Sequence, residues 1–151
     1  MKVLITGANG FVGKNLQLHL AERKDVEVVS FTRAHAVADL PAMLQGVDCV
    51  FHLAGINRPQ DPAEFVTGNT DLTQALANAA ADVVARTGKK VPVIYTSSTQ
   101  AERDSPYGQS KRAAEEALFA LQRQHRVPVH VFRLPNVFGK WCKPNYNSAV
   151  A

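Results

Sequence analysis

Cysteine is scarce in this sequence: Cys49 and Cys142 are the only two among 151 residues, and they lack the spacing of a disulfide framework. Such usage fits a reducing compartment and predicts a cytoplasmic protein. No apolar run approaches the roughly 18 residues of a membrane-spanning helix, so no membrane association is expected. Met1 leads directly into a strand-like apolar run at residues 3–5, so no signal peptide is expected either.

Charge is also modest and unclustered. The formal net charge of +4 comes from 17 basic and 13 acidic residues, with no basic stripe interleaved with aromatics, so no nucleic-acid partner is predicted. A mild positive bias suits anionic small molecules without identifying one. The histidines show no ligand spacing, and no metal site is predicted; they are His19, His35, His52, His125 and His130.

What the sequence does contain is a regular alternation of two patterns over a length typical of one domain. Short runs rich in Val and Ile have the character of strands buried on both faces of a parallel sheet; they span residues 2–6, 26–31, 48–53, 91–96 and 129–134. Helical patterns separate them at residues 10–23, 37–45, 69–87 and 107–126, and the Ala-rich part of the third should pack closely on the sheet. This alternation predicts an α/β fold with a doubly wound parallel sheet and right-handed crossovers.

A glycine triplet follows the first predicted strand and opens the first helix. Such a loop lets backbone approach a pyrophosphate, while the helix N-terminus supplies amide donors and the positive end of its dipole. The three glycines suit a tight turn, close phosphate approach and close helix packing, although their spacing is G-x-x-G-x-x-G rather than G-x-G-x-x-G. We predict a cofactor-binding loop here, with a plain turn as the alternative; its residues are Gly7, Gly10, Phe11, Val12 and Gly13.

The second predicted strand runs into Arg33 with no acidic residue nearby. In NAD sites this point usually carries an Asp or Glu that accepts from the ribose hydroxyls, whereas an Arg accommodates a 2′-phosphate. Because guanidinium groups pair well with phosphate, Arg33 favours NADP(H) over NAD(H). A surface arginine without a ligand is the alternative.

Tyr107 and Lys111 are four residues apart in a predicted helix, and Ser98 lies a short loop upstream. At that spacing the phenol and the ammonium share one helix face, a turn apart. An ammonium near a phenol favours the phenolate and lowers the phenol's pKa from about 10. Such a tyrosine can exchange a proton with a carbonyl or carbinol oxygen. Since Tyr-x-x-x-Lys also occurs by chance, the alternative is a surface tyrosine and a solvated lysine.

Taken in this order along the chain, these motifs resemble the extended short-chain dehydrogenase/reductase superfamily, which includes nucleotide-sugar epimerases, dehydratases and reductases. The resemblance covers essentially the whole chain. It implies that Ser98 orients the substrate oxygen and that Tyr107 and Lys111 form the proton relay, with Lys111 also holding the nicotinamide ribose. His52, a lone histidine at a strand end, is predicted to be structural.

The same resemblance assigns further cofactor contacts. Leu53, Ala54 and Gly55 match the backbone that lines the cofactor, and Asn69 matches a helix-start residue beside it. Asn136 matches an asparagine that helps to hold the substrate diphosphate. The resemblance also implies a UDP-sugar substrate and a homodimer.

A narrower resemblance rests on residues 54–59, the short loop between Ser98 and Tyr107, and residues 139–148. These are similar to the N-terminal half of bifunctional capsule and O-antigen enzymes that make UDP-N-acetyl-6-deoxy-L-talosamine, a precursor of UDP-N-acetyl-L-fucosamine. That resemblance implies NADPH-dependent reduction of a UDP-4-keto-6-deoxy-N-acetylhexosamine at C4. In those enzymes a zinc-binding cupin domain follows the reductase half.

Domain organisation and two alternatives complete the prediction. The alternation stops after residue 134, so residues 1–151 are expected to form an NAD(P)-binding Rossmann domain, the N-terminal part of a longer reductase truncated before its substrate lobe. The first alternative is a nucleotide-sugar 4-epimerase that retains NAD. The second is a catalytically silent NAD(P)-binding module.

Overall fold

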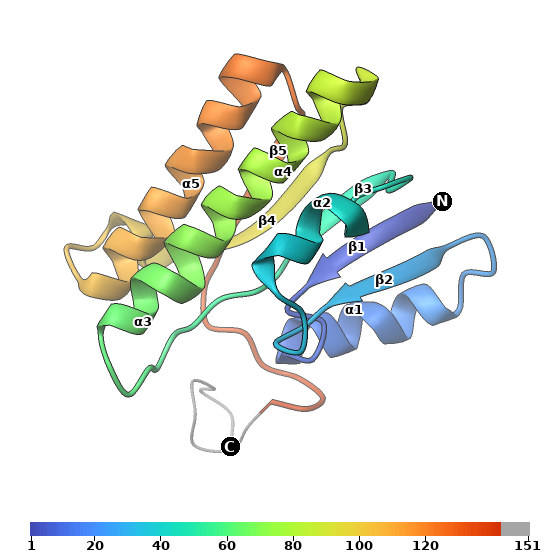
Figure 1. The fold of residues 1–151 in the computed structure, drawn as a ribbon. Helices are drawn as coiled ribbons and strands as arrows, with labels where there is room; N and C mark the ends of the chain where they lie inside the picture. Colours follow the sequence, from blue (N-terminus) through green and yellow to red (C-terminus); the bar gives the residue numbers. More distant parts are fainter. Residues whose placement is uncertain (143–151) are drawn as a thin grey trace.

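The Val- and Ile-rich runs pair as five parallel strands in the order β2-β1-β3-β4-β5, as the computed structural model of the protein shows (Figure 1). The structure describes residues 1–142. The predicted parallel α/β fold is confirmed. The strands are Lys2–Thr6 (β1), Glu27–Phe31 (β2), Cys49–His52 (β3), Val93–Ser98 (β4) and Val129–Leu134 (β5).

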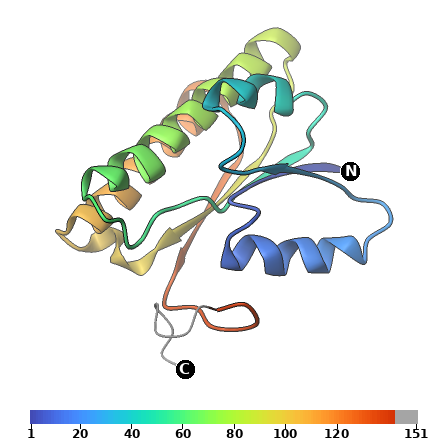
Figure 2. The same ribbon diagram turned by 60° about the horizontal axis from the view of Figure 1, so that its bottom comes forward.

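Helices cover both faces of this sheet, as expected for a doubly wound, Rossmann-like fold (Figure 2). Helix α1 (Phe11–Ala21) lies on one face, and α2 (Leu40–Met43), α4 (Leu72–Thr87) and α5 (Pro106–His125) lie on the other. Small side chains of α4, those of Ala77, Ala79 and Ala80, are buried in the core on this face. The core between α4, α5 and the sheet includes Val50, Leu76, Ala79, Ala80, Val93 and Leu118.

Two predicted helices differ from the structure. Residues 37–45 form only a 3₁₀ turn, Val37–Asp39 (η1), and the four-residue α2, because Pro41 supplies no amide for a longer helix. The helix predicted at 69–87 begins earlier, as α3 (Ala63–Phe65) and a π-helical segment, η2 (Val66–Asp71), that leads into α4. Segments of this π-helical kind are often found at functional sites.

The prediction that the strands are buried on both faces is confirmed for β1 but is wrong for the edge strands β2 and β5. Val3, Leu4 and Ile5 are fully buried, whereas Phe132 on β5 is 54% exposed. Strand β5 lies at the sheet edge, and within residues 1–142 the helix on the α1 face lies beside β1 and β2, leaving the corresponding face of β5 open (Figure 2).

The sheet topology creates a crevice at the carboxyl ends of the strands. Strand β1 pairs with β2 on one side and β3 on the other, so the connections after β1 and β3 diverge at the carboxyl ends of these strands. Ligands of open parallel sheets bind at such a switch point. Strand β4 extends two residues further than predicted and carries Ser97 and Ser98 to the same end of the sheet.

Over residues 1–142, no helix combines the length and apolar character needed to cross a membrane.

Candidate functional site

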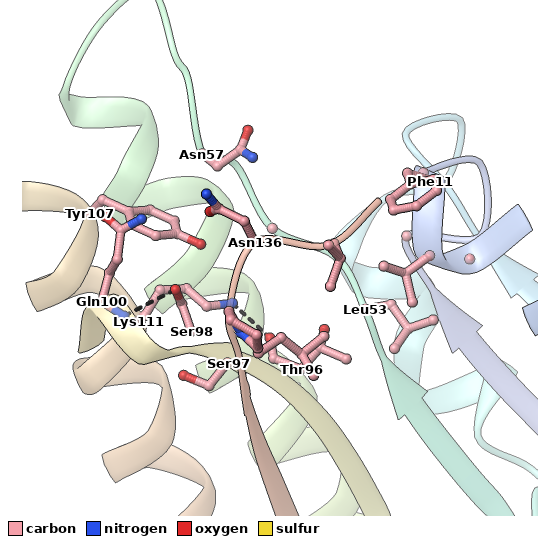
Figure 3. A pocket seen from close by; sticks show the side chains of 18 of the residues that line it. Phe11, Leu53, Asn57, Thr96, Ser97, Ser98, Gln100, Tyr107, Lys111 and Asn136 are labelled. Carbon is pink, nitrogen blue, oxygen red and sulfur yellow. Dashed lines mark hydrogen bonds between the residues drawn. The ribbon is translucent and has the colours of Figure 1, made fainter. Parts of the chain in front are cut away.

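A cavity of about 500 Å³ opens at the carboxyl ends of the strands (Figure 3). It lies between the glycine loop, the ends of β3 and β4, the start of α5 and the segment after β5. It brings together most of the residues predicted from the sequence. Those that line it are Gly7, Gly10, Phe11, Val12, Gly13, Leu53, Gly55, Ser98, Tyr107, Lys111 and Asn136.

Three predicted residues do not line the cavity. Ala54 and Asn69 lie directly behind its wall and act through hydrogen bonds described below. Arg33 is exposed in the turn after β2, outside the cavity. Its predicted contact with a 2′-phosphate therefore stays a prediction.

The glycine loop has the shape that a pyrophosphate requires. Gly7 has a φ of +70°, and a Cβ there would lie 2.6 Å from the backbone nitrogen of Ala54, so the loop packs directly on the end of β3. A Cβ on Gly13 would overlap the carbonyl oxygen of Gly7. Gly10 caps α1, and its side-chain position faces only that carbonyl oxygen, at 3.1 Å. With no acidic residue in its first turn, α1 directs a positive dipole end at this space, which fits a bound pyrophosphate.

The segment after β5 returns across the cavity to α1. The side-chain amide of Asn15 donates to the carbonyl oxygens of Phe11 and Lys140, both at 2.9 Å. This contact places Val137 and Cys142 in the cavity wall beside the glycine loop. No sequence pattern predicts this contact, because Asn15 and Lys140 are 125 residues apart.

His52 is structural, as predicted, and its hydrogen bonds assign its tautomer. The Thr73 hydroxyl donates to the carbonyl of Asn69 at 2.6 Å, so it must accept from His52 Nε2–H at 2.8 Å. Nδ1 then accepts from the Thr6 hydroxyl at 2.6 Å, and Thr6 in turn accepts from the Ala54 amide at 3.2 Å. This buried chain ties the ends of β1 and β3 to α4 beneath the cavity.

Burial, with a smaller effect of the Lys111 charge, lowers the pKa of His52 from 6.5 to about 3. Because only the unfolded chain takes up this proton between those values, the stabilisation is complete above pH 6.5 and is lost as the pH falls toward 3. We expect about 2 kcal/mol less stability at about pH 5 than at about pH 7.5 from this group, measured by urea unfolding. His52→Asn should show a correspondingly smaller difference between the two pH values, and an equal difference would assign the effect to other groups.

Asn69 fixes the loop after β3 to the start of α5. Its amide oxygen accepts from the backbone N–H of Ile56 at 2.8 Å, and its amide nitrogen donates to the carbonyl of Ile56 at 2.9 Å. The same nitrogen donates to the Ser110 hydroxyl at 3.0 Å, which donates to the carbonyl of Tyr107 at 2.8 Å. Asn69 is thus fully engaged in orienting backbone beside Tyr107, one layer behind the cavity.

Lys111 is almost completely buried at the floor of the cavity. Its ammonium donates to the carbonyl oxygen of Thr96 at 2.9 Å and lies 4.5 Å from the ring centroid of Tyr95. Burial lowers the pKa of Lys111 from 10.5 to about 8, although the negative charge of Glu115 partly opposes this shift. Tyr107 lies one turn earlier on α5, half-buried, with its ring 5.6 Å from that of Phe65.

Ser98 is held with its hydroxyl hydrogen available. Its oxygen accepts from the backbone N–H of Gln100 at 3.1 Å, in the 3₁₀ turn Thr99–Glu102 (η3), which leaves the O–H to donate into the cavity. The following turn is compact because Gly108 has no side chain: a Cβ there would overlap the carbonyls of Gln100 and Arg103. This packing brings Ser98 and Tyr107 to the same end of the cavity (Figure 3).

Eight lining residues were not predicted from the sequence, and three of them, Thr96, Asn57 and Gln100, bring polar groups to the cavity. Thr96 acts through its carbonyl oxygen, which carries no side-chain signal. Asn57 and Gln100 lie near Tyr107 and add amide groups to the cavity (Figure 3). Their position depends on the loop after β3 and on the turn after Ser98, neither of which has a recognisable sequence pattern.

The chemistry available is that of proton transfer and oxyanion stabilisation. No carboxylate is among the lining residues that the structure describes, and residues 1–142 hold no group of three side chains suited to a metal ion. One end of the cavity fits a pyrophosphate, and the other presents a hydroxyl, a phenol and an ammonium. Such an arrangement can place a proton donor beside a bound nucleotide.

The sequence profile of the NAD dependent epimerase/dehydratase family matches residues 3–151, and the chain belongs to this family. It is 60% identical to UDP-2-acetamido-2,6-beta-L-arabino-hexul-4-ose reductase of Pseudomonas aeruginosa (strain PA103) over 151 residues, which are 100% of this chain and 40% of that protein. The chain therefore spans less than half the length of that relative.

Solved structures show the same similarity. The capsular polysaccharide assembling protein CapF from Staphylococcus aureus is 38% identical with a TM-score of 0.76, covering 99% of this chain and 38% of that one. UDP-glucuronic acid 4-epimerase from Bacillus cereus, solved in complex with NAD, has a TM-score of 0.81 at 24% identity, covering 92% of this chain and 58% of that one. At this identity the second structure supports the fold alone.

Proposed function

We propose that this protein is the cofactor-binding part of an NADPH-dependent reductase that acts on the C4 ketone of a UDP-4-keto-6-deoxy-N-acetylhexosamine. The observation that carries the proposal is the convergence of Ser98, Tyr107 and Lys111 at one end of a cavity whose other end is the glycine loop. The Pseudomonas relative, a reductase of a UDP-hexul-4-ose, supports this substrate class.

The residues present fit the cofactor. The glycine loop leaves room for a pyrophosphate at the start of α1, and Lys111 is a buried cation in the same cavity that would hold the ribose. When bound, NADPH supplies the hydride. The protein supplies a dry, oriented site beside it, which accounts for much of the rate.

Two side chains then act on the substrate oxygen, and a third assists one of them. The Ser98 hydroxyl donates a hydrogen bond to the ketone oxygen, and Tyr107 gives its proton as negative charge develops there. Lys111 favours the phenolate that remains, because its ammonium charge lies on the same helix face. Asn136, at the open side of the cavity, is proposed to contact the diphosphate of the UDP-sugar. The homodimer implied by the resemblance remains a proposal.

The test is direct. The purified chain is mixed with NADPH and a UDP-2-acetamido-2,6-dideoxy-hexos-4-ulose, and consumption of reduced nicotinamide is followed together with the product sugar. NADPH binding is measured separately by calorimetry. Absence of NADPH binding would refute the proposal. Binding without turnover, both by this chain and by a longer chain that includes the expected substrate lobe, would favour the silent-module alternative. Purification with tightly bound NAD would instead favour the 4-epimerase.

Cofactor choice gives a separate prediction. Arg33→Ala should weaken NADPH binding roughly 10- to 100-fold while changing NADH affinity less than about twofold, because only the 2′-phosphate pairs with the guanidinium. Calorimetric titration with each cofactor measures both affinities. Arg123→Ala, which removes an exposed arginine near the end of α5, is the matched control and should change neither. Equal losses for the two cofactors would remove the 2′-phosphate contact from Arg33.

A further inference from the structure

An ion network centred on the buried Glu115 lies next to Lys111 on α5. Glu115 follows Lys111 by one turn of α5, and its side chain is only 4% exposed. Arg133 of β5 binds this carboxylate with two hydrogen bonds, from Nε at 2.9 Å and Nη2 at 2.7 Å. Ser97 donates to the same carboxylate at 2.5 Å. None of these residues lines the cavity except Ser97.

The network joins every element that carries a proposed reacting group. Ser97 precedes Ser98 on β4, and Glu115 shares a face of α5 with Tyr107 and Lys111. Arg133 reaches onward to Glu102 at 2.7 Å, in the turn between Ser98 and Tyr107. The outer arm is exposed, since the Glu102 side chain is 76% accessible, so the buried Glu115 is its central member.

The titratable groups around Lys111 come from four elements. On α5, Lys111 has Tyr107 one turn before it and Glu115 one turn after it. Strand β4 contributes the ring of Tyr95, and β3 contributes His52. The charge of Lys111 adds to the effect of burial in lowering the pKa of His52. Arg133 on β5 is paired with Glu115. Among these neighbours Glu115 is the one carboxylate in the described part of the chain that raises the pKa of Lys111, against the larger lowering by burial.

Glu115 is itself held in the charged form. Burial alone would raise its pKa, but the hydrogen bonds from Arg133 and Ser97 and the charges of Arg133 and Lys111 outweigh burial, so its pKa lies below the ordinary value. Ionised Glu115 is therefore present at every pH at which Lys111 titrates. A buried ammonium in a low-dielectric site depends on such a partner to keep its proton.

We propose that Glu115 is a positioning residue of this site: its carboxylate, fixed by Arg133 and Ser97, keeps the ammonium of Lys111 charged for cofactor binding and for the Tyr107 proton step. The assignment of those two roles to Lys111 rests on the proposed function. The effect of Glu115 on Lys111 itself does not.

The experiment follows Lys111 directly, by the carbon-13 shift of its Cε as a function of pH, with the signal assigned from Lys111→Arg. In Glu115→Gln, a near-isostere, the Lys111 midpoint should fall by about half a pH unit to one unit, because a favourable negative charge is lost. A purely structural role predicts the opposite: water entering a loosened site would move the midpoint up toward the ordinary 10.5. An unchanged or raised midpoint overturns the proposal.

Two further variants complete the test. Glu115→Asp keeps the charge and should hold the midpoint closer to the original than Glu115→Gln does. Asp48→Asn, which breaks the exposed pair with Lys89 at the opposite end of the sheet, should leave it unchanged. If Glu115→Gln does not fold, the double change Glu115→Gln with Arg133→Met removes both charges together, and a smaller fall in the same direction is expected because the positive charge of Arg133 is lost as well.

The functional consequence is read separately. If NADPH binds as proposed, its affinity should begin to fall at a lower pH in Glu115→Gln, by the same interval as the Lys111 midpoint. A shifted midpoint without a shifted affinity profile would overturn the link to cofactor binding. Failure of the unmodified chain to bind NADPH would refute the proposed function while leaving the Lys111 titration as a test of Glu115.

Discussion

Replacing Tyr107 by Phe is expected to abolish ketone reduction while NADPH binding persists. The ring would keep its contact with Phe65, at 5.6 Å between centroids, so the wall of the cavity is retained. Only the hydroxyl that gives the proton is lost. Since general acid catalysis contributes roughly 10²- to 10⁴-fold, turnover should fall by at least that range. Stopped-flow measurement of nicotinamide oxidation checks the rate, and calorimetry checks cofactor affinity.

A second buried tyrosine provides the matched control. Tyr95 is fully buried, and its hydroxyl has no hydrogen-bond partner in the described part of the structure. Tyr95→Phe removes a phenol hydroxyl of the same chemistry while leaving the ring beneath Lys111. It should be neutral or stabilising, because an unsatisfied buried polar group is removed, and turnover should be preserved. Retained turnover in Tyr107→Phe would take that residue out of the proton step.

Much of this site was predictable because its signals are local. The glycine triplet lies directly between a strand and a helix, and Tyr107 and Lys111 share a helix face whatever the rest of the fold does. The strands were found because their Val- and Ile-rich runs are short and bounded. Ser98 needed only the correct order of elements, which placed the end of β4 beside the start of α5.

What the sequence could not predict depends on contacts between distant residues. Glu115 and Arg133 are 18 residues apart and meet only because β5 pairs beside β4 under α5. Asn69 was assigned to the cofactor from the family resemblance, but in the π-helical segment its amide bonds to Ile56 and Ser110. The exposure of β5 depends on its place at the sheet edge, which its apolar sequence does not reveal.

These contacts between distant residues hold the backbone around the cavity in place. The Thr6–His52–Thr73 chain fixes the backbone of Ala54 beneath the glycine loop, and Asn69 fixes the backbone of Tyr107. Both devices use buried, fully paired polar groups, which are rigid because any displacement would leave a donor unsatisfied. The cavity is thus shaped by a layer of residues that do not themselves line it.

Replacing Gly7 by Ala should have the largest effect on cofactor binding. The residue has a φ of +70°, which costs an L residue roughly 1–2 kcal/mol. In addition, the new Cβ would lie 2.6 Å from the Ala54 nitrogen and 2.8 Å from the Leu53 carbonyl carbon, both backbone atoms that cannot rotate away. The loop must therefore move off the end of β3. Overpacking of this kind costs about 1–3 kcal/mol, so cofactor affinity should fall roughly 10- to 100-fold or more.

Gly88→Ala separates backbone strain from displacement of the loop. Gly88 ends α4 with a φ of +71°, nearly the same conformation as Gly7, but nothing lies within 4 Å of its side-chain position. Both variants should therefore lose stability from the left-handed backbone, Gly7→Ala more than Gly88→Ala because of its added overlap, as measured by thermal unfolding, and only Gly7→Ala should lose NADPH affinity. If the two variants bound NADPH equally well, close packing of the glycine loop on the end of β3 would not be what shapes the pyrophosphate site.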